Sequence, residues 1–288
     1  MIPEPIAHAL TIDVEDYFQV LNLRAHCPPE SWDRIPLRCP AATRRLLDLL
    51  DRHTTKATFF VLGWIAERVP DLVREIAARG HEVGSHGYDH RCLPELGEVG
   101  FRAELARTNA ILEPLVGRPI QAFRACTWSI SLKTPWALPA LVEAGFTRDS
   151  SIHPVRHPDY GIADAPLTPH ILEPLPGREL FELPPLVTSF LGRRLPLGGG
   201  GYLRLFPVRW ISSALRRREA RSIPSCLYLH PWEVDPDQPR YPVRGLRGFR
   251  HYVNLKRTEA KLTRLLERHR FTTLHEVERH YRQVQRRL

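Results

Sequence analysis

The stretch AHALTIDV at Ala7–Val14, with Glu15 and Asp16 directly after it, decides the fold. It is a short, β-prone and largely apolar run that ends abruptly in acids. Such a run predicts a buried strand that delivers carboxylates at its carboxyl end. In folds built from parallel strands and helices, functional groups gather at that end of the strands.

Helices and strands are expected to alternate after this first strand. The expected elements are a helix at 40–53, a strand at 57–62, a helix at 71–79, a strand at 81–85, a helix at 101–116, a strand at 121–124, a helix at 135–144 and a strand at 146–149. They are followed by a long ordered loop region or small insertion at 154–185, a mobile four-glycine loop at 198–201, a strand at 225–230, a helix at 255–269 and a last helix that opens at the capping box Thr273-x-x-Glu276. The alternation predicts a parallel α/β architecture.

The composition is that of a folded globular protein. The chain has 288 residues, of which 43% are hydrophobic and 25% charged, so disordered and fibrous proteins are excluded. The five cysteines are odd in number and form no C-x-x-C pair, which favours reduced thiols in a cytoplasm. No signal peptide is expected at the start, and no apolar run is long enough to cross a membrane.

Positive charge is concentrated at the end of the chain. The net charge is +9, yet residues 240–288 hold fourteen Lys and Arg against four Glu and no Asp, so the remainder is close to neutral. Leu262, Leu265 and Leu266 give this region a packed face, and we therefore expect no nucleic-acid binding. Its basic side is expected to be a solvated surface or a contact with anionic lipid head groups or a biosynthetic complex.

His86 and His90 form an H-x-x-x-H pair directly after the expected strand at 81–85. On a helical turn this spacing brings two imidazoles to one face, where they can share a metal ion. A second pair with the same spacing, His153 and His157, is interrupted by Pro154, which discourages a helical turn. Capping or surface histidines are the alternative for either pair.

Three carboxylates crowd the end of the first strand, at Asp13, Glu15 and Asp16. Their repulsion and desolvation are costly unless a cation is present. Two histidines and one carboxylate leave a metal ion with an open position for water, as in catalytic zinc sites. A second carboxylate that does not bind the metal can deprotonate that water. Acids that only cap a helix are the alternative.

Five motifs in a fixed order carry a family resemblance. They are T-x-D followed by D/E, S-H-x-x-x-H, F-R-A, D-S-S and L-H-P. Together they resemble the polysaccharide deacetylases of carbohydrate esterase family four, the NodB-homology group. The runs TIDVEDYFQV, DSSIHPVRHPDYG and HPWEVDPDQPR are most similar to the branch found with exosortase-linked exopolysaccharide loci. The resemblance implies an α/β fold, a distorted (β/α)7-type barrel at residues 1–235, with an Arg-rich helical extension at 236–288 packed on it.

The resemblance also implies four catalytic roles. Asp13 is expected to be the general base, and Arg124 to orient it through a charge-assisted hydrogen bond. His230 is expected to be the general acid that protonates the departing amine, with Asp149 tuning it.

The expected cofactor is one divalent metal ion, zinc, with cobalt or nickel as alternatives. His86 and His90 are the expected ligands. The third is Glu15 or Asp16, with Glu15 favoured by the D-x-D spacing of related branches. The residues expected to contact substrate are Trp128, Leu229 and His157.

Cys126 departs from the family pattern, which usually has Pro two residues after the motif arginine. Because Cys is small and apolar, we expect the local packing to be kept. A nucleophilic Cys126 is the alternative, but no histidine partner is evident for it in the sequence.

These assignments predict a metal-dependent hydrolase that removes N-acetyl groups from an amino-sugar polysaccharide or its precursor in exopolysaccharide biosynthesis. We expect it in the cytoplasm or at the inner face of the membrane. The alternatives are a hydrolase of a small C–N bond, as in allantoinase-like relatives, and a non-catalytic glycan-binding protein. An open groove with exposed Trp128, Tyr160 and Trp232 would favour a glycan, and a closed pocket a small amide.

Overall fold

The computed structural model describes residues 6–157, 160–190 and 192–286. A sheet crosses its centre, and along it strands run parallel in the order β10-β1-β2-β3-β4-β5-β7. In that order the strands are Cys226–Leu229, His8–Val14, Thr58–Val61, Glu82–Ser85, Ala122–Phe123, Arg148–Asp149 and Arg178–Glu182. Two more join the sheet outside this path: β6 (His170–Leu175), antiparallel to β7, and β11 (Phe271–Thr272), parallel to β1.

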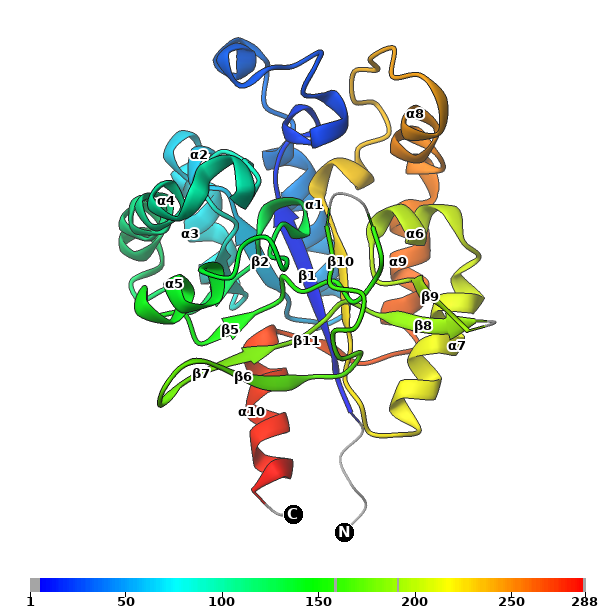
Figure 1. Cartoon of the computed structure of the whole chain (residues 1–288). Helices are drawn as coiled ribbons and strands as arrows, with labels where there is room; N and C mark the ends of the chain where they lie inside the picture. The colour runs from blue at the N-terminus through cyan, green and yellow to red at the C-terminus, as the bar shows by residue number, and fades with distance from the viewer. Residues whose placement is uncertain (1–5, 158–159, 191, 287–288) are drawn as a thin grey trace.

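The two ends of the parallel path are joined by the chain that follows β7. Pro185 forms a parallel bridge with Cys226 of β10, and the Leu186 N–H donates to the Cys226 carbonyl at 2.8 Å. The path therefore closes into a distorted barrel of the (β/α)7 type, which confirms the expected fold class (Figure 1). A separate hairpin of β8 (Val187–Phe190) and β9 (Arg193–Pro196) follows.

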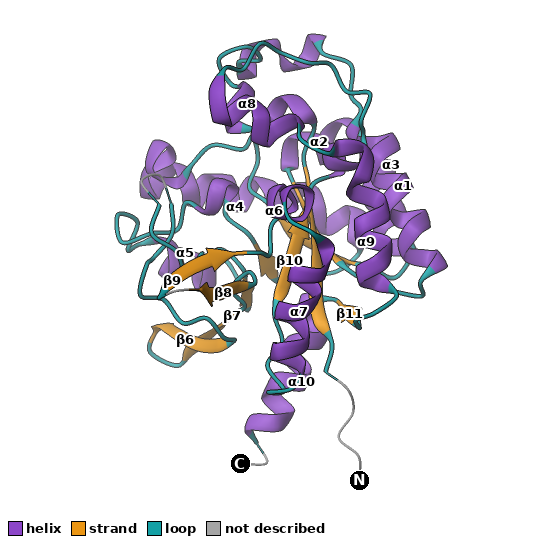
Figure 2. Ribbon diagram, turned by 90° about the vertical axis from the view of Figure 1, so that its right-hand side faces the viewer, coloured by secondary structure: helices purple, strands orange, loops and turns teal. Residues whose placement is uncertain are grey.

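Helices cover the outside of the barrel, as Figures 1 and 2 show. They are α1 (Cys39–Arg52), α2 (Gly63–Arg68), α3 (Pro70–Ala78), α4 (Leu93–Val116), α5 (Ala137–Glu143), α6 (Gly200–Leu205), α7 (Val208–Glu219), α8 (Gly245–Tyr252), α9 (Thr258–Leu266) and α10 (Leu274–Gln285). The short 3₁₀ helices are η1 (Tyr17–Gln19), η2 (Leu21–Leu23), η3 (Pro29–Arg34), η4 (Cys126–Trp128), η5 (Pro231–Val234) and η6 (Leu255–Arg257). None of the helices described has the length and apolar character needed to cross a membrane.

The two faces of β1 have different neighbours because side chains alternate along a strand. Leu10, Ile12 and Val14 pack outward in the large core beneath the helices. Ala9 lies in a second apolar cluster with side chains from other strands and two from α10, Leu274 and Val277. Helix α10 therefore closes the amino end of the barrel, and the carboxyl end is left for polar groups.

Two expectations for the second half of the chain are wrong. The region 154–185 is not only loop, because it contains β6 and β7. The glycines at 198–201 are not a mobile loop, since Gly199 is bridged to Tyr228 and Gly200 begins α6. A Cβ at Gly198 would lie 2.6 Å from the Leu186 nitrogen, so these glycines permit close approach of backbones.

Candidate active site

The carboxyl ends of β1, β3, β4 and β10 meet at one end of the barrel, where a cleft of about 420 Å³ opens. The expected site residues that line it are Asp13, Glu15, His86, His90, Trp128, His157 and His230. A larger cavity of about 740 Å³, between α10 and the chain before β1, is lined by none of the expected site residues. The chemistry therefore lies in the smaller cleft.

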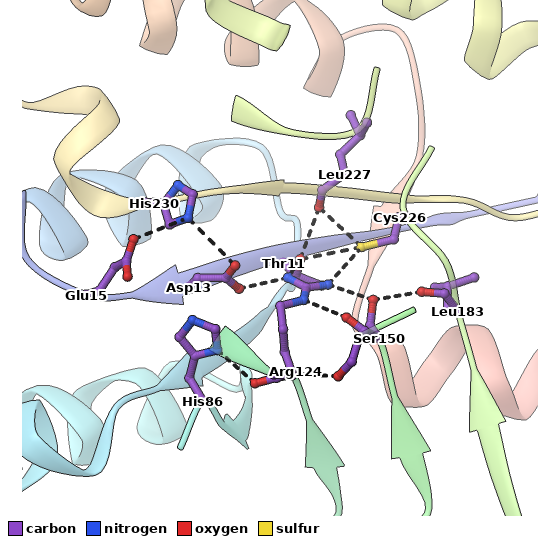
Figure 3. Close-up of polar contacts among 12 residues, drawn as sticks. Thr11, Asp13, Glu15, His86, Arg124, Ser150, Leu183, Cys226, Leu227 and His230 are labelled. Carbon is purple, nitrogen blue, oxygen red and sulfur yellow. Dashed lines mark hydrogen bonds and ion pairs between the residues drawn. The ribbon is translucent and has the colours of Figure 1, made fainter. Parts of the chain in front are cut away.

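Asp13 and Arg124 form a buried ion pair beneath the cleft (Figure 3). The Arg124 Nη1 donates to Asp13 Oδ1 at 2.8 Å, and both side chains are at most 3% exposed. The remaining guanidinium donors bind Thr11 Oγ1 and the carbonyl and hydroxyl of Ser150. Because all its donors are engaged, Arg124 is held rigidly, and it holds one oxygen of Asp13 while Oδ2 stays on the cleft side.

The histidine pair lies on a bend after β3 and not on a helical turn, contrary to the expectation from its spacing. Gly87 and His90 have φ values of 73° and 59°, and these left-handed residues fold the chain back. The two rings meet with centroids 5.5 Å apart. His86 Nδ1 is bonded to the Arg124 carbonyl at 2.9 Å, so its Nε2 is the nitrogen left for a metal.

Glu15 brings a carboxylate to these imidazoles. Its Oε2 lies 2.8 Å from His90 Nε2, yet this buried oxygen has no hydrogen-bond partner. Burial raises the pKa of Glu15, but the nearby His90, His230 and His86 outweigh burial and hold it well below its usual range. The Glu15 oxygen, the adjacent His90 nitrogen and the free Nε2 of His86 are donors of the kind that a divalent cation binds, so the residues fit the implied metal.

Asp16 lies outside the cleft and acts as a backbone cap. Its Oδ1 accepts from the Tyr17 N–H at 2.8 Å, and its Oδ2 accepts from the N–H groups of Arg38 and Cys39 at 2.6 and 2.8 Å. Both oxygens are thus occupied. Of the two carboxylates left open by the sequence, the structure brings Glu15 to the histidines and Asp16 to the start of α1.

Cys126 is buried against the histidine pair. It forms, with His86 and His90, the one group of three metal-binding side chains in the described chain whose ligand atoms all lie within 4.8 Å of one another. Its thiol donates to the His86 carbonyl at 2.8 Å and does not line the cleft. Burial raises the pKa of the thiol well above its usual value, which argues against a nucleophilic Cys126.

His230 lies across the cleft from the histidine pair. Its Nε2 is 3.3 Å from Glu15 Oε1 and 3.9 Å from Asp13 Oδ2. Its Nδ1 is 2.7 Å from Glu233 Oε1. Burial lowers the pKa of His230, but Glu15, Glu233 and Asp13 together raise it to about 9, so the ring carries a proton at neutral pH.

Asp149 does not contact His230, which corrects the expectation that it tunes this residue. It accepts a hydrogen bond from Ser151 Oγ and lies opposite Glu182 in the pairing of β5 with β7. Burial raises the pKa of Asp149 to about 6, and burial together with the Asp149 charge raises that of Glu182 well above its usual value. Asp149 and Glu182 thus form a buried pair of their own, and the carboxylate beside His230 is that of Glu233.

Two of the three expected substrate contacts line the cleft. Trp128 packs at its base, 4.7 Å from the Tyr228 ring, and His157 stacks on Tyr160 at 3.9 Å between ring centroids. Leu229 does not line the cleft and is 1% exposed in the core. Because side chains alternate along β10, Tyr228 shares the inward face with His230, and Leu229 points outward. That alternation could have been read from the sequence.

Two further side chains at the site, Glu233 and Arg204, were not expected from the sequence, and Trp232, expected only as an exposed groove aromatic, has a different role. The Trp232 Nε1 donates to Glu15 Oε1 at 3.2 Å, and its ring stacks on His230. Glu233 and Arg204 complete the surroundings of His230. Spacing could have indicated Glu233, three residues after His230, whereas no local pattern connects Arg204 to a site 26 residues further along.

Comparison with known families agrees with this barrel and its cluster of histidines and carboxylates. Residues 31–147 match the family described as polysaccharide deacetylase. Residues 150–279 match a domain described as being of unknown function, DUF3473. The chain thus contains a region similar to polysaccharide deacetylases, followed by a region similar to this second domain. The two matched ranges adjoin near residue 148.

The curated relative matches only part of this chain, whereas two solved structures match nearly all of it. A peptidoglycan-N-acetylglucosamine deacetylase of Bacillus cereus is 43% identical over 75 residues, which is 26% of this chain and 27% of that protein. The chain thus matches about a quarter of that relative's length. Among solved structures, a Mycobacterium smegmatis protein provisionally named a polysaccharide deacetylase has a TM-score of 0.64 at 21% identity, over 99% of this chain and 93% of that one. Puue allantoinase has a TM-score of 0.61 at 18% identity, over 97% and 91%. These two likenesses concern the fold.

Proposed function

We propose that this protein is a metal-dependent hydrolase that removes N-acetyl groups from amino sugars in a polysaccharide or its precursor. The observation that carries the proposal is the arrangement around His230 Nε2, which lies within 4 Å of both Asp13 and Glu15. A base, an acid and a metal-binding carboxylate thus face one point of the cleft. The named activity of the Bacillus cereus relative supports the same reaction.

His86, His90 and Glu15 would hold the metal ion, and zinc is the proposed ion with cobalt or nickel as alternatives. When bound, such an ion polarises the acetyl carbonyl and lowers the pKa of water. Cys126 is the competing third ligand on distance alone. Glu15 is favoured because it lines the cleft, where a ligand must leave room for water and substrate.

Asp13 and His230 divide the proton transfers between them. Arg124 holds Asp13 Oδ1, so Oδ2 is the oxygen that takes a proton from the attacking water. The water oxygen bonds to the acetyl carbon, and the C–N bond then breaks. His230 Nε2 gives its proton to the leaving nitrogen, and the products are acetate and the free amino sugar.

Acetate release from N-acetylated chitooligosaccharides tests the proposal. The protein is stripped with a chelator and assayed before and after addition of zinc, cobalt or nickel. We expect metal-dependent release, and a fall in kcat on the order of 10²-fold or more in Asp13→Asn and His230→Ala. Asp48→Asn, an exposed carboxylate of α1, serves as the matched control and should retain full activity.

Two outcomes would reject parts of this proposal. Full turnover by His230→Ala with metal bound would remove His230 as the acid. No metal-dependent release from any acetylated glycan would favour the non-catalytic glycan-binding alternative.

The cleft favours a glycan over a small amide, although less simply than the sequence suggests. Trp128 and Trp232 are 7% and 6% exposed, so they are not open platforms. Half-buried tyrosine rings line the cleft instead, at Tyr160, Tyr202 and Tyr228. Its volume of about 420 Å³ exceeds what a small amide occupies. Hydrolysis of allantoin without release of acetate from any glycan would support the allantoinase-like alternative.

The resemblance to the exopolysaccharide-linked branch supports an exopolysaccharide precursor as the substrate.

We also propose that the cleft mouth contacts an anionic membrane through α8, with the protein in the cytoplasm. Leu246 and Phe249 are 79% and 55% exposed, and α8 packs beside η2, where Leu21 is also exposed. Arg247 and Arg250 line the cleft, and neither has an acidic partner in the described residues. Exposed apolar groups flanked by unpaired arginines favour an anionic lipid surface. All five cysteines are free, which supports a reducing compartment.

Flotation with phosphatidylglycerol vesicles tests this contact. The double variant Leu246→Ser/Phe249→Ser should lose binding, and high salt should weaken it in the unaltered protein. Leu132→Ser, which removes an 83% exposed leucine elsewhere, is the control. Equal flotation by all three proteins would contradict the proposed surface.

A further inference from the structure

The Nδ1 nitrogen of the His230 ring faces the buried carboxylate of Glu233. Glu233 Oε1 lies 2.7 Å from His230 Nδ1 and accepts the His230 backbone N–H at 3.1 Å. Glu233 is 0% exposed, and the His230 side chain is 19% exposed. Glu233 forms part of the cleft wall, but its carboxylate is buried there, and its partner on the cleft side is the imidazole.

Arg204 holds the other oxygen of this carboxylate. Its Nε donates to Glu233 Oε2 at 2.6 Å, and its Nη1 donates to the carbonyls of Arg250 and His251 at 2.9 and 2.6 Å. Arg204 is 3% exposed. Burial raises the pKa of Glu233, but Arg204 and His230 hold it below its usual range, so Glu233 is an acceptor only.

The glycine run at 198–201 makes room for this arrangement. A Cβ at Gly200 would lie 1.9 Å from Glu233 Oε1, closer than any side chain tolerates. A Cβ at the neighbouring Gly201 would meet only Arg204 Nη2, at 3.8 Å. The first turn of α6 is therefore shaped around the Glu233 carboxylate.

We infer that Glu233, held by Arg204, is a positioning residue that fixes the orientation and tautomer of His230. An acceptor at Nδ1 keeps a proton on that nitrogen, so Nε2 is the atom that gives a proton to the leaving group. The inference rests on the proposed function, in which His230 is the acid. It also assigns a role to the domain of unknown function, because His230, Glu233 and Arg204 all lie within residues 150–279.

Activity on two substrates distinguishes a positioning role of Glu233 from a role in stabilising the fold. An N-acetylated chitooligosaccharide needs a proton on its leaving nitrogen, whereas 4-nitrophenyl acetate releases a stable phenolate without one. In Glu233→Gln we expect kcat for the amide to fall on the order of 10²-fold, with kcat for the ester within about threefold of the unaltered protein. Equal losses on both substrates, or no loss on the amide, would overturn the inference.

Glu82→Gln is the matched control. Glu82 is also a buried glutamate paired with an arginine, Arg148, at 3.1 Å, but it lies at the amino end of β3, away from the cleft. Loosening of the fold in this variant should lower both rates together, so its amide-to-ester ratio should stay unchanged.

A readout that needs no turnover keeps the inference distinct from the proposed function. The Nδ1 proton of His230 should give a downfield proton resonance, identified by its absence in His230→Ala. We expect this resonance to move upfield or disappear in Glu233→Gln and to persist in Glu82→Gln. An unmoved resonance in Glu233→Gln overturns the positioning role whatever the activity, whereas absent acetate release with a shifted resonance rejects only the proposed reaction.

Discussion

Glu15 and Asp16 are adjacent carboxylates with opposite tasks. The Glu15 side chain turns into the cleft with that of Asp13, two residues earlier, because alternate residues share a face. Asp16 turns the other way and satisfies three backbone N–H groups at the starts of η1 and α1. Burial raises the pKa of Asp16 despite these bonds, whereas the surrounding histidines keep that of Glu15 well below its usual range.

The two residues should therefore respond differently to removal of charge. We expect Glu15→Gln to lose zinc affinity by at least tenfold and also to lower the free energy of unfolding of the metal-free protein, because the carboxylate pairs with the histidines. Asp16→Asn should instead cost about 1–2 kcal/mol of stability, because a cap is weakened, while zinc affinity is kept. Calorimetric zinc titration and urea unfolding measure the two quantities. Loss of zinc affinity in Asp16→Asn alone would reverse the assignment.

At the scale of elements, α6 shows how a short helix can serve a distant site. It begins at Gly200, against the Glu233 carboxylate, and carries Arg204 one turn later, so packing and positioning depend on one backbone path. A side chain at its first residue has no space, whereas one at the next residue does.

Gly200→Ala should therefore be costly and Gly201→Ala nearly neutral. We expect Gly200→Ala to lower the free energy of unfolding by about 1–3 kcal/mol through overpacking. It should also lower amide hydrolysis more than hydrolysis of 4-nitrophenyl acetate, because Glu233 is displaced. Urea unfolding and the two-substrate assay check both effects. Equal behaviour of the two alanine variants would show that the contact at Gly200 relaxes freely.

Helix α10 begins as the sequence predicts, but with half of the expected capping box. Thr273 Oγ1 accepts from the Glu276 N–H at 3.1 Å, whereas the Glu276 side chain pairs with Arg279. Thr273→Ala should thus cost about 1 kcal/mol of stability, and Glu276→Gln less than about 0.5 kcal/mol. Thermal or urea unfolding of the two variants distinguishes them, and equal costs would indicate a complete capping box in solution.

At the scale of the molecule, both parts of the chain build one barrel. Strand β10 of the second part lies beside β1 of the first, and His230 faces Asp13 and Glu15 across that junction. The region 236–288 also contributes to the barrel, through β11 and through the α10 residues that close its amino end.

Removal of residues 236–288 should therefore unfold the protein and not leave a folded barrel. Leu274 and Val277 are at most 2% exposed, and each contributes about 1.5–3 kcal/mol by burial. Because domains are stable by only about 5–15 kcal/mol, residues 1–235 alone should show no cooperative unfolding transition. Urea titration followed by circular dichroism checks this. A cooperative transition of that fragment would support an independent deacetylase domain with a packed extension.

Buried histidines make the stability of the whole molecule depend on pH. Burial lowers the pKa of His8 and of His81 to about 4, from an unfolded value near 6.5. Between these values the unfolded chain binds the proton more tightly. The stability that these two histidines contribute should thus be complete above pH 6.5 and fall as the pH drops toward 4, by up to about 3 kcal/mol for each histidine.

His81 offers the cleaner test of this dependence. Its Nδ1 accepts the Ala57 N–H at 3.2 Å, its buried Nε2 has no partner, and the charges of Lys56, Asp51 and Arg79 lie nearby. His81→Asn, compared with the exposed His275→Asn, should reduce the loss of unfolding free energy between pH 6.5 and 4. An unchanged pH profile would show that burial does not lower the pKa of His81.

Local patterns determined the fold class and most of the site. The apolar run before Asp13, the motif around His86 and His90, and the strand before His230 each place a functional group at a strand end, and parallel strands bring those ends together. The strand pair β6 and β7 was missed because prolines and glycines in 154–185 hid the alternation.

Only the tertiary structure decided which groups meet. It separated Glu15 from Asp16, moved Asp149 away from His230 and turned Leu229 outward, because strand facing and pairing set these contacts. It also brought Arg204 and Glu233 to His230, a contact that requires α6 to pack over β10. The sequence gives the type of each residue and the periodicity around it. The chemistry of a side chain and the positions of the strand ends can therefore be predicted from the sequence. Contacts between segments far apart in the chain depend on how whole elements pack, and they arise only in the folded molecule.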